Sequence, residues 1–493
     1  YDLYEALVEV LGDVASSSPI LYVIDDVQWA DRSTLALVEH LLRQDRTGRL
    51  LVLGTIRRPA GRATPDLDRL INDLRRDDRV DQIEVRGMST DDVAQLLAGR
   101  GVGDAATVAE ALRQRTGGNP YFLESLAEHD ADLAQLGSRD LPSSVRDLID
   151  QRVDALDPEV ARVLTAASVI GMRVDLDLLA AVTDLDIDAL LDVVDLAVEA
   201  ALLVEDEDIG WVTFPHALVR HGLLARTTRN REAQLNLRVA DALEQGRGPD
   251  RDLAIAQHLA NAGRLCPPPR AAEAALRAAR SALARSSDDE GRTWARRAAL
   301  AVAALDDDVA WQLTAAARLL EAEADRRLGE VRSAETTLDL VIAEARHRAD
   351  ARVLAQAAQE RCLAIAGVGF AFGTVDLDLL ELLDEALGLV PDDRAADRTS
   401  LLAWSSIARN STADKPQQRS LAERAVAGAR EQPARPDLLA LALLAERLAH
   451  ATPDGLERRL EVGPEMGAAA AAAGWSDLIV VGMVLDVVDL LES

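Results

Sequence analysis

The sequence predicts an incomplete α/β domain at the N-terminal end, followed by a much longer and mainly α-helical part. Three observations lead to this fold class. Short apolar runs alternate with helical or polar segments over the first 85 residues. Further along, apolar residues recur at helical spacing, and from about residue 250 the chain becomes rich in alanine. A length of 493 residues also requires several domains, because one domain usually contains about 100–200 residues.

The α/β character rests on three strand-like runs, residues 20–24, 50–53 and 80–85. Helical or polar segments separate these runs, which is the order expected of a parallel sheet with crossover helices. We therefore assign residues 1–86 to an α/β domain, and the family resemblance described below implies that they are its C-terminal part.

Residues 87–140 are predicted to form a small helical domain. Two short amphipathic helices are expected here. The first opens with Ser89 and Thr90 ahead of Asp91 and Asp92, and both hydroxyls and carboxylates are typical of a helix N-terminus.

Residues 141–248 change character again and predict a winged-helix domain. Pro142 precedes a helix, and Asp157-Pro158 suits the N-cap and first turn of the next helix. Two strand-like runs, residues 201–204 and 211–214, then bracket an acidic turn. Helices followed by a hairpin are the elements of a winged helix.

Residues 249–493 predict a solenoid of helical hairpins similar to tetratricopeptide repeats. The expected starts of the helix pairs are Ala271, Asp308, Ala351, Ala396 and Pro436. These intervals are irregular and longer than the 34-residue tetratricopeptide unit. Trp294, Trp311 and Trp404 either line a groove in this arm or belong to its core.

Charge and composition exclude several functions. The net charge is −30, which opposes sequence-independent binding of nucleic acid. Cys266 and Cys362 form no CxxC pair, so the sequence supports neither a disulfide framework nor a zinc site and fits a reducing cytoplasm. No run reaches the roughly 18 apolar residues of a membrane span, and we expect no membrane partner.

The strongest candidates for functional residues are Asp25 and Asp26, which follow the apolar run 20–24. Ligands of open α/β sheets bind at the carboxyl ends of parallel strands. Asp25 is there a candidate magnesium ligand, and Asp26 is a candidate for polarising an attacking water. The alternative is a strand followed by an acidic helix cap.

The longer string Asp25-Asp26-Val-Gln-Trp29-Ala-Asp31 resembles the Walker B region of the signal-transduction ATPases with numerous domains, the STAND class of AAA+-related ATPases. More narrowly, it is similar to the large ATP-binding regulators of the LuxR type and their maltose-regulator-like relatives. The resemblance implies a partial P-loop NTPase domain with ATP or ADP and Mg²⁺ as cofactors. The following parts would be a helical lid, a winged helix and a repeat arm.

Three other segments agree with this resemblance in order. The run 50–57 resembles the next strand and its sensor arginine, which makes Arg57 a candidate contact to the terminal phosphate. The segment 116–122 resembles the lid motif whose proline, here Pro120, lies near the adenine. The segment 214–220 resembles the end of the winged helix, where His216 would contact the diphosphate.

Each of these segments also has a structural interpretation. Arg57 can be a surface arginine, and Gly117-Gly118-Asn119-Pro120 can be an ordinary turn. His216 can be a core histidine. A glycine-rich run, residues 367–373, is interpreted as a loop between repeat helices, because neither a strand nor a βαβ unit accompanies it.

A phosphate-binding loop, Gly-x-x-x-x-Gly-Lys-Ser/Thr, is missing from the sequence. The only lysine is Lys415, and no glycine loop precedes it. We expect that loop in a portion preceding Tyr1, and the chain can be a slow ATPase only if that portion exists. Residues 174–210 contain twelve acidic residues and no basic one. DNA contact is therefore expected only through an output domain outside this chain.

The resulting hypothesis is an ATP/ADP-dependent signalling switch. It would be a transcriptional regulator that a small-molecule or protein inducer activates at the repeat arm and that then self-associates. One alternative is a helical-repeat scaffold that binds a protein partner and carries a degenerate nucleotide fold. Another alternative is an AAA+ remodelling motor. Its Walker B motif normally ends in Asp-Glu, and Asp26 stands in place of that glutamate.

Overall fold

The structure is a computed structural model in which mainly α-helical elements alternate with few strands. It describes residues 2–25, 27, 30, 32–44, 49–56, 71, 74, 80–100, 105–116, 118–120, 123, 150, 152–246, 251–366, 375–391 and 393–492. The chain divides into two compact units, Tyr1–Arg247 with Asn261–Leu265, and Gly248–Ala260 with Cys266–Ser493. In the part that is described, no helix is long and apolar enough to cross a membrane.

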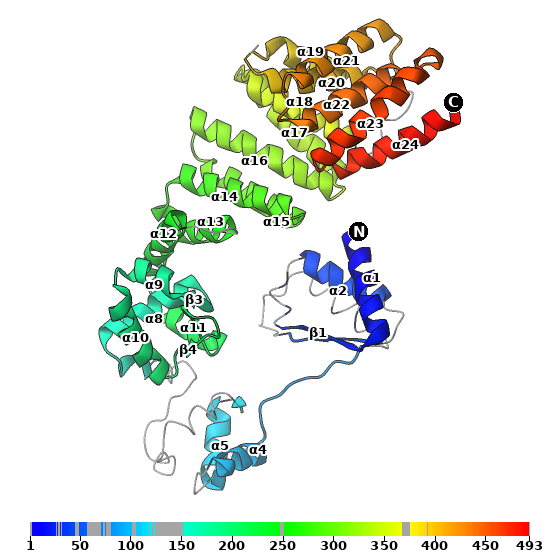
Figure 1. The fold of residues 1–493 in the computed structure, drawn as a ribbon. Helices are drawn as coiled ribbons and strands as arrows, with labels where there is room; N and C mark the ends of the chain where they lie inside the picture. Colours follow the sequence, from blue (N-terminus) through cyan, green and yellow to red (C-terminus); the bar gives the residue numbers. More distant parts are fainter. Residues whose placement is uncertain are drawn as a thin grey trace. The chain divides into compact units, whose positions relative to one another are not determined.

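The N-terminal elements form a small α/β layer (Figure 1). They are, in chain order, α1 (Asp2–Ser17), β1 (Ile20–Ile24), α2 (Arg32–Gln44) and β2 (Leu50–Gly54). The strands are parallel and in register from the pair Ile20–Leu50 to the pair Ile24–Gly54. Two of the three predicted strands are therefore confirmed.

The prediction of a third strand at residues 80–85 is wrong. The structure describes these residues without strand geometry, and the side chains of Ile83 and Val85 are 82% and 93% exposed. Their apolar pattern is that of a strand, but a strand also requires a neighbour to receive its backbone hydrogen bonds.

Two helices, α4 (Thr90–Gly99) and α5 (Ala105–Thr116), pack against each other around Val93, Leu97 and Leu112. The helix start predicted at Ser89 is confirmed. The Ser89 hydroxyl accepts a hydrogen bond from the backbone N–H of Asp92, and the Asp92 carboxylate accepts one from the backbone N–H of Ser89. This reciprocal cap satisfies two N–H groups that the helix itself leaves unpaired.

The next body consists of helices around a small antiparallel sheet with strand order β3-β5-β4. Its elements are α8 (Pro158–Ile170), β3 (Arg173–Asp175), α9 (Leu176–Thr183), α10 (Ile187–Glu199), β4 (Val204–Glu205), β5 (Trp211–Thr213), α11 (Ala217–Arg226) and α12 (Arg229–Gln245). The acidic turn joins β4 to β5, as predicted. The predicted cap is also confirmed, because the carboxylate of Asp157 accepts a hydrogen bond from the Glu159 N–H.

The remaining chain is a sequential array of helices (green to red in Figure 1). In order these are α13 (Arg251–Ala262), η3 (Gly263–Leu265), α14 (Pro268–Ala284), α15 (Asp288–Val302), α16 (Asp308–Arg327), α17 (Val331–His347), α18 (Ala351–Ala366), α19 (Leu377–Leu389), α20 (Ala395–Ala408), α21 (Lys415–Arg430), α22 (Pro436–Ala449), η4 (Pro453–Gly455), α23 (Leu456–Ala472) and α24 (Ser476–Glu492). From α14 onward each helix packs on the next.

The predicted starts of the helix pairs agree with the first residues of α14, α16, α18, α20 and α22 to within three positions. Alanines dominate the buried faces of these helices, so their backbones can approach closely. Trp294, Trp311 and Trp404 are at most 8% exposed and belong to the core rather than to an open groove. Residues 367–373 lie outside the described residues.

Candidate functional site

The candidate nucleotide site begins at the carboxyl ends of β1 and β2. Asp25 follows β1 directly and is exposed, and Thr55 follows β2 directly. The Thr55 hydroxyl donates a hydrogen bond to Oδ1 of Asp25. Both residues therefore lie at the sheet edge where open α/β folds bind their ligands.

Backbone hydrogen bonds hold the two strand ends in this relationship. The N–H of Thr55 donates to the carbonyl oxygen of Ile24 over 3.0 Å, and the N–H of Val27 donates to the carbonyl oxygen of Thr55 over 2.8 Å. The side chain of Val27 is buried. The residues on both sides of Asp25 are therefore hydrogen-bonded to Thr55. These backbone bonds fix the position of Asp25 at the end of β2.

Thr55 is the member of this site that sequence reasoning missed. The run 50–57 was interpreted through Arg57 alone. A hydroxyl residue directly after the neighbouring parallel strand is the pattern that points to it, because equivalent ends of adjacent parallel strands lie together.

Asp26 and Arg57, the candidates for water activation and phosphate contact, lie outside the described residues. Within the residues described, no group of three or more His, Cys, Asp or Glu side chains could hold a metal ion. Asp25 alone would supply one ligand of a Mg²⁺ ion. Magnesium commonly takes one or two carboxylates and completes its coordination shell with water and phosphate oxygens.

The glycine motif around Gly118 has a local structural role. Its backbone has φ = 71°, and its carbonyl oxygen accepts a hydrogen bond of 2.8 Å from the N–H of Met88. A Cβ at this position would lie 2.5 Å from the carbonyl oxygen of Met88. Only glycine fits there, and the contact ties the segment before α4 to the end of α5.

Pro120 lies beside this contact and is exposed. The carbonyl oxygen of Asn119 accepts a hydrogen bond from the N–H of Leu123, so Pro120 occupies the first turn of a helix. Proline suits that position because the first N–H groups of a helix have no partner within it. The described part of the motif therefore contains a turn, in agreement with its structural interpretation. The ring of Pro120 remains accessible.

His216 is half-buried in the turn between β5 and α11. Its carbonyl oxygen accepts a hydrogen bond from the N–H of Val219. The ends of the same motif are structural. Phe214 is 3% exposed in the core, and Nε of Arg220 donates to the carbonyl oxygen of Ser168 on α8 over 2.7 Å. Burial lowers the pKa of the Arg220 guanidinium.

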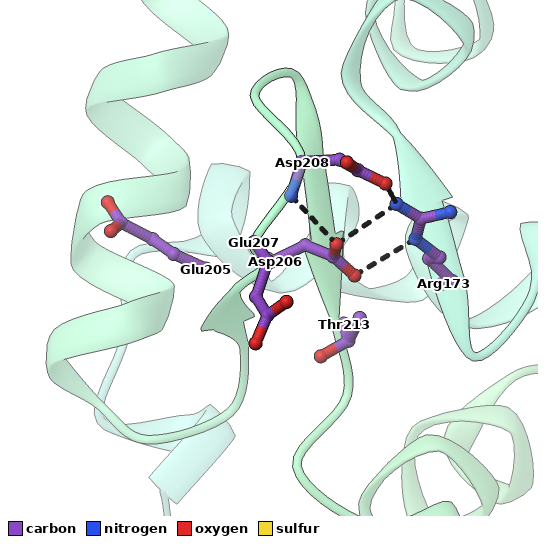
Figure 2. Close-up of a pocket in the computed structure, with 6 residues that line it drawn as sticks. All are labelled: Arg173, Glu205, Asp206, Glu207, Asp208 and Thr213. Atoms are coloured by element: carbon purple, nitrogen blue, oxygen red, sulfur yellow. Dashed lines mark hydrogen bonds and ion pairs between the residues drawn. The ribbon is translucent and has the colours of Figure 1, made fainter.

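A second feature of the same body is an open cavity of about 470 Å³ at the β4–β5 turn. Its lining is Arg173, Glu205, Asp206, Glu207, Asp208 and Thr213. Figure 2 shows Arg173 pointing at Asp206 and Asp208 across this turn.

Arg173 fastens the turn rather than forming an anion site. Its guanidinium donates two hydrogen bonds to Asp206, of 2.9 and 3.0 Å, and pairs with Asp208. It also stacks 4.3 Å from the ring centre of Trp211. The hydrogen bond from Arg173 lowers the pKa of Asp206. Four carboxylates line the cavity, and the charge of its one arginine is already paired with Asp206 and Asp208, so the cavity is unfavourable for phosphate.

Comparison with known proteins gives a distant structural similarity. No family model and no curated protein sequence matches the chain. Among solved structures, the chain is similar to a signal transduction ATPase with numerous domains (STAND) protein with a tetratricopeptide repeat sensor from Pyrococcus horikoshii. The similarity covers 98% of this chain and 72% of that chain, at 12% identity and a TM-score of 0.45. Because the identity and the TM-score are this low, the similarity supports no functional assignment, which has to come from the geometry of the chain itself.

Proposed function

We propose that this chain is the body of a STAND-type switch that alternates between ATP and ADP. The observation that carries the proposal is the exposed Asp25 carboxylate at the end of β1, joined to Thr55 at the end of β2. The two parallel strands end in a carboxylate and a hydroxyl. Oxygen groups of these kinds can bind Mg²⁺ and can orient the water that attacks a phosphate.

The proposed domains are residues 1–86 for the nucleotide-binding part, 87–140 for the lid, 141–248 for the winged helix and 249–493 for the sensor arm. The strand order β3-β5-β4 with helices on either side in sequence supports the winged helix. The sequential packing of α14 to α24 supports the arm.

The proposed roles of the site residues follow the order of the motifs. Asp25 would bind magnesium through water, Asp26 would activate the attacking water, and Arg57 would contact the terminal phosphate. Pro120 would lie against the adenine, and its exposure supports this role. His216 would contact the diphosphate, and its position in a half-buried turn leaves its ring partly accessible.

The exposed face of the sheet supports a nucleotide domain that is completed by further residues. Leu21, Val23, Leu51 and Leu53 are between 49% and 64% exposed. Parallel sheets in α/β proteins are normally covered on both faces. Within the part of the chain that the structure describes, this face is open, and a βα unit with a phosphate-binding loop would both cover it and supply the lysine that the nucleotide requires.

In the proposed mechanism, ADP holds the winged helix against the nucleotide domain, and an inducer at the repeat arm favours exchange for ATP. Each ligand must bind the two states with different affinity for the switch to operate. Transcriptional regulation would then act through an output domain outside this chain, after self-association in the cytoplasm.

The test is made on the full-length natural protein. It should retain ADP through purification, and Asp25→Asn should lower its affinity for Mg-ATP at least tenfold. Asp13→Asn is the matched control, because Asp13 is an exposed carboxylate on α1. If no nucleotide is retained and ATP leaves the oligomeric state unchanged, the switch mechanism is wrong.

The alternative proposal is a helical-repeat scaffold that does not hydrolyse nucleotide. Lys415, the only lysine, donates hydrogen bonds to the carbonyl oxygen of Asn410 and to Gln418 at the start of α21. Its role in this chain is therefore structural. A scaffold would bind its protein partner with the same affinity whether Mg-ATP, Mg-ADP or no nucleotide is present, whereas the switch would not.

A further inference from the structure

Positive charge in the body formed by α8 to α12 is concentrated in one stretch, from Phe214 to Arg231. This stretch contains four arginines, two histidines and no acidic residue. Residues 174–210 of the same body contain twelve acidic residues and no basic one. The basic stretch starts at the end of β5, includes α11 and continues into α12. An anionic ligand is therefore attracted to this stretch rather than to the acidic turn.

Arg220 is fixed at the contact between α11 and α8, which pack on each other (Figure 1). Its Nε donates a hydrogen bond of 2.7 Å to the carbonyl oxygen of Ser168, in the last turn of α8. The last carbonyl groups of a helix have no partner within it, so this bond caps α8. It uses only one of the five N–H donors of the guanidinium.

The remaining donors of Arg220 are available to a ligand. Among the residues that the structure describes, neither Nη1 nor Nη2 is hydrogen-bonded, and Arg220 forms no ion pair. The residue is half-buried. Burial lowers the pKa of its guanidinium, and the nearby Glu232 only partly opposes this effect. Because an arginine stays protonated in proteins, this position holds a positive charge that has lost water without gaining a counter-ion.

Two other arginines of the same body are purely structural and differ in this respect. Arg173 and Arg226 each pair with two aspartates. Hydrogen bonds to these aspartates raise the pKa of both guanidinium groups. The charge of Arg220 has no such partner, which is the condition expected of an arginine that binds an external anion.

Arg220 also lies close to His216, the candidate contact to the diphosphate. The two residues are four positions apart, about one helical turn. The start of α11 is held by the core, because Phe214 and Val219 are 3% and 2% exposed. The N–H of Val219 donates to the carbonyl oxygen of His216 over 3.0 Å. Residues one turn apart are neighbours, so a single diphosphate group can reach both side chains.

We propose that the guanidinium of Arg220 binds the diphosphate of ADP beside His216. This inference rests on the proposed function and adds a second role to a residue that caps α8. Arginine suits both roles, because its terminal nitrogens can bind phosphate oxygens while Nε keeps its bond to Ser168. A DNA duplex is the less suitable anion, since Arg220 is half-buried and the acidic turn belongs to the same body.

Nucleotide affinities of the full-length natural protein test the proposal. Arg220→Gln should raise the Kd of ADP at least about tenfold and change that of adenosine less than about twofold, because adenosine has no diphosphate. Arg229→Gln is the matched control, because Arg229 is an exposed arginine of the same stretch. It should change neither Kd. If Arg220 only capped α8, the glutamine would weaken ADP and adenosine by the same factor.

Chemical protection of the wild-type protein remains decisive if the glutamine variant misfolds. An arginine-specific dicarbonyl reagent should modify Arg220 in the nucleotide-free protein. ADP should slow this reaction several-fold, adenosine and a DNA duplex should not, and Arg229 should react at the same rate throughout. A wild-type protein that binds no ADP would overturn the proposed function and this inference together. ADP binding that neither depends on Arg220 nor protects it would overturn this inference alone.

Discussion

The hydroxyl of Thr55 donates a hydrogen bond to the carboxylate of Asp25, although the two residues lie 30 positions apart in the sequence. The contact joins the ends of two parallel strands and orients a carboxylate at the sheet edge. It is the smallest element of the proposed nucleotide site, and it can be tested without any nucleotide.

Replacing Thr55 with valine should loosen the end of the sheet. The shape of the side chain is kept, but the hydrogen bond to Asp25 is lost, and an exposed bond of this kind contributes about 1 kcal/mol or less. Hydrogen exchange of the backbone amides in β1 and β2 should become several-fold faster. Thr55→Ser, which keeps the hydroxyl, should exchange at close to the native rate.

Replacing Gly118 with alanine should separate α4 and α5 from each other. The positive φ and the 2.5 Å approach to the carbonyl oxygen of Met88 together predict a cost of at least about 2 kcal/mol. Limited proteolysis should cut the region of α4 and α5 faster. Gly99→Ala is the control, because a Cβ there meets no atom within 4 Å. It should leave the rate unchanged or lower it, and equal rates for both variants would contradict the steric argument.

Stability should depend on pH through Glu360 on α18. Burial raises the pKa of Glu360 to about 7, Glu323 adds to this effect, and Arg326 and Arg327 oppose it. The folded chain therefore holds the proton to higher pH than the unfolded chain does. The stabilising contribution is complete below the ordinary value of 4.5 and is lost as the pH rises through 7.

Glu360→Gln should therefore stabilise the chain at pH 8 by up to about 3 kcal/mol and have little effect at pH 4.5. Thermal unfolding at the two pH values measures the difference. The exposed Glu381 on α19 is the matched control. Glu381→Gln should shift the two melting temperatures equally, and the same behaviour of Glu360→Gln would disprove the assignment.

Removing the Asp489 charge should destabilise the end of the array. The side chains of Asp489, Arg447 and Arg459 are at most 6% exposed, so Asp489→Asn leaves two buried guanidinium groups short of a partner. A loss of about 3–5 kcal/mol is expected in urea unfolding. Glu465→Gln breaks the exposed pair with Arg430 instead and should cost no more than about 0.5 kcal/mol.

Much of the fold could be predicted from the sequence where local chemistry decides it. Ser89 and Asp157 mark helix starts because their side chains bond to N–H groups two or three residues further along. The repeat helices could be placed because apolar residues recur at helical spacing. The run 80–85 was predicted wrongly because its pattern satisfies a strand locally while no neighbouring strand pairs with it in the described structure.

The candidate site was predictable only in part. Asp25 could be found from an apolar strand that ends in carboxylates. Its partner Thr55 could not, because the register between β1 and β2 decides which residues meet at the sheet edge. The glycine at position 118 could be interpreted as a turn, but the approach of Met88 that requires it is a contact between distant segments.

The sequence by itself determined the order of an α/β segment, helices, a hairpin and a long helical array, because periodicity and capping act over a few residues. Only the tertiary structure decided that Trp311 and Trp404 are core residues and that the valines of α24 are exposed. The sequence alone makes both kinds of side chain candidates for burial. Burial depends on which helices pack on each face, and that is a property of contacts between segments rather than of the segments themselves.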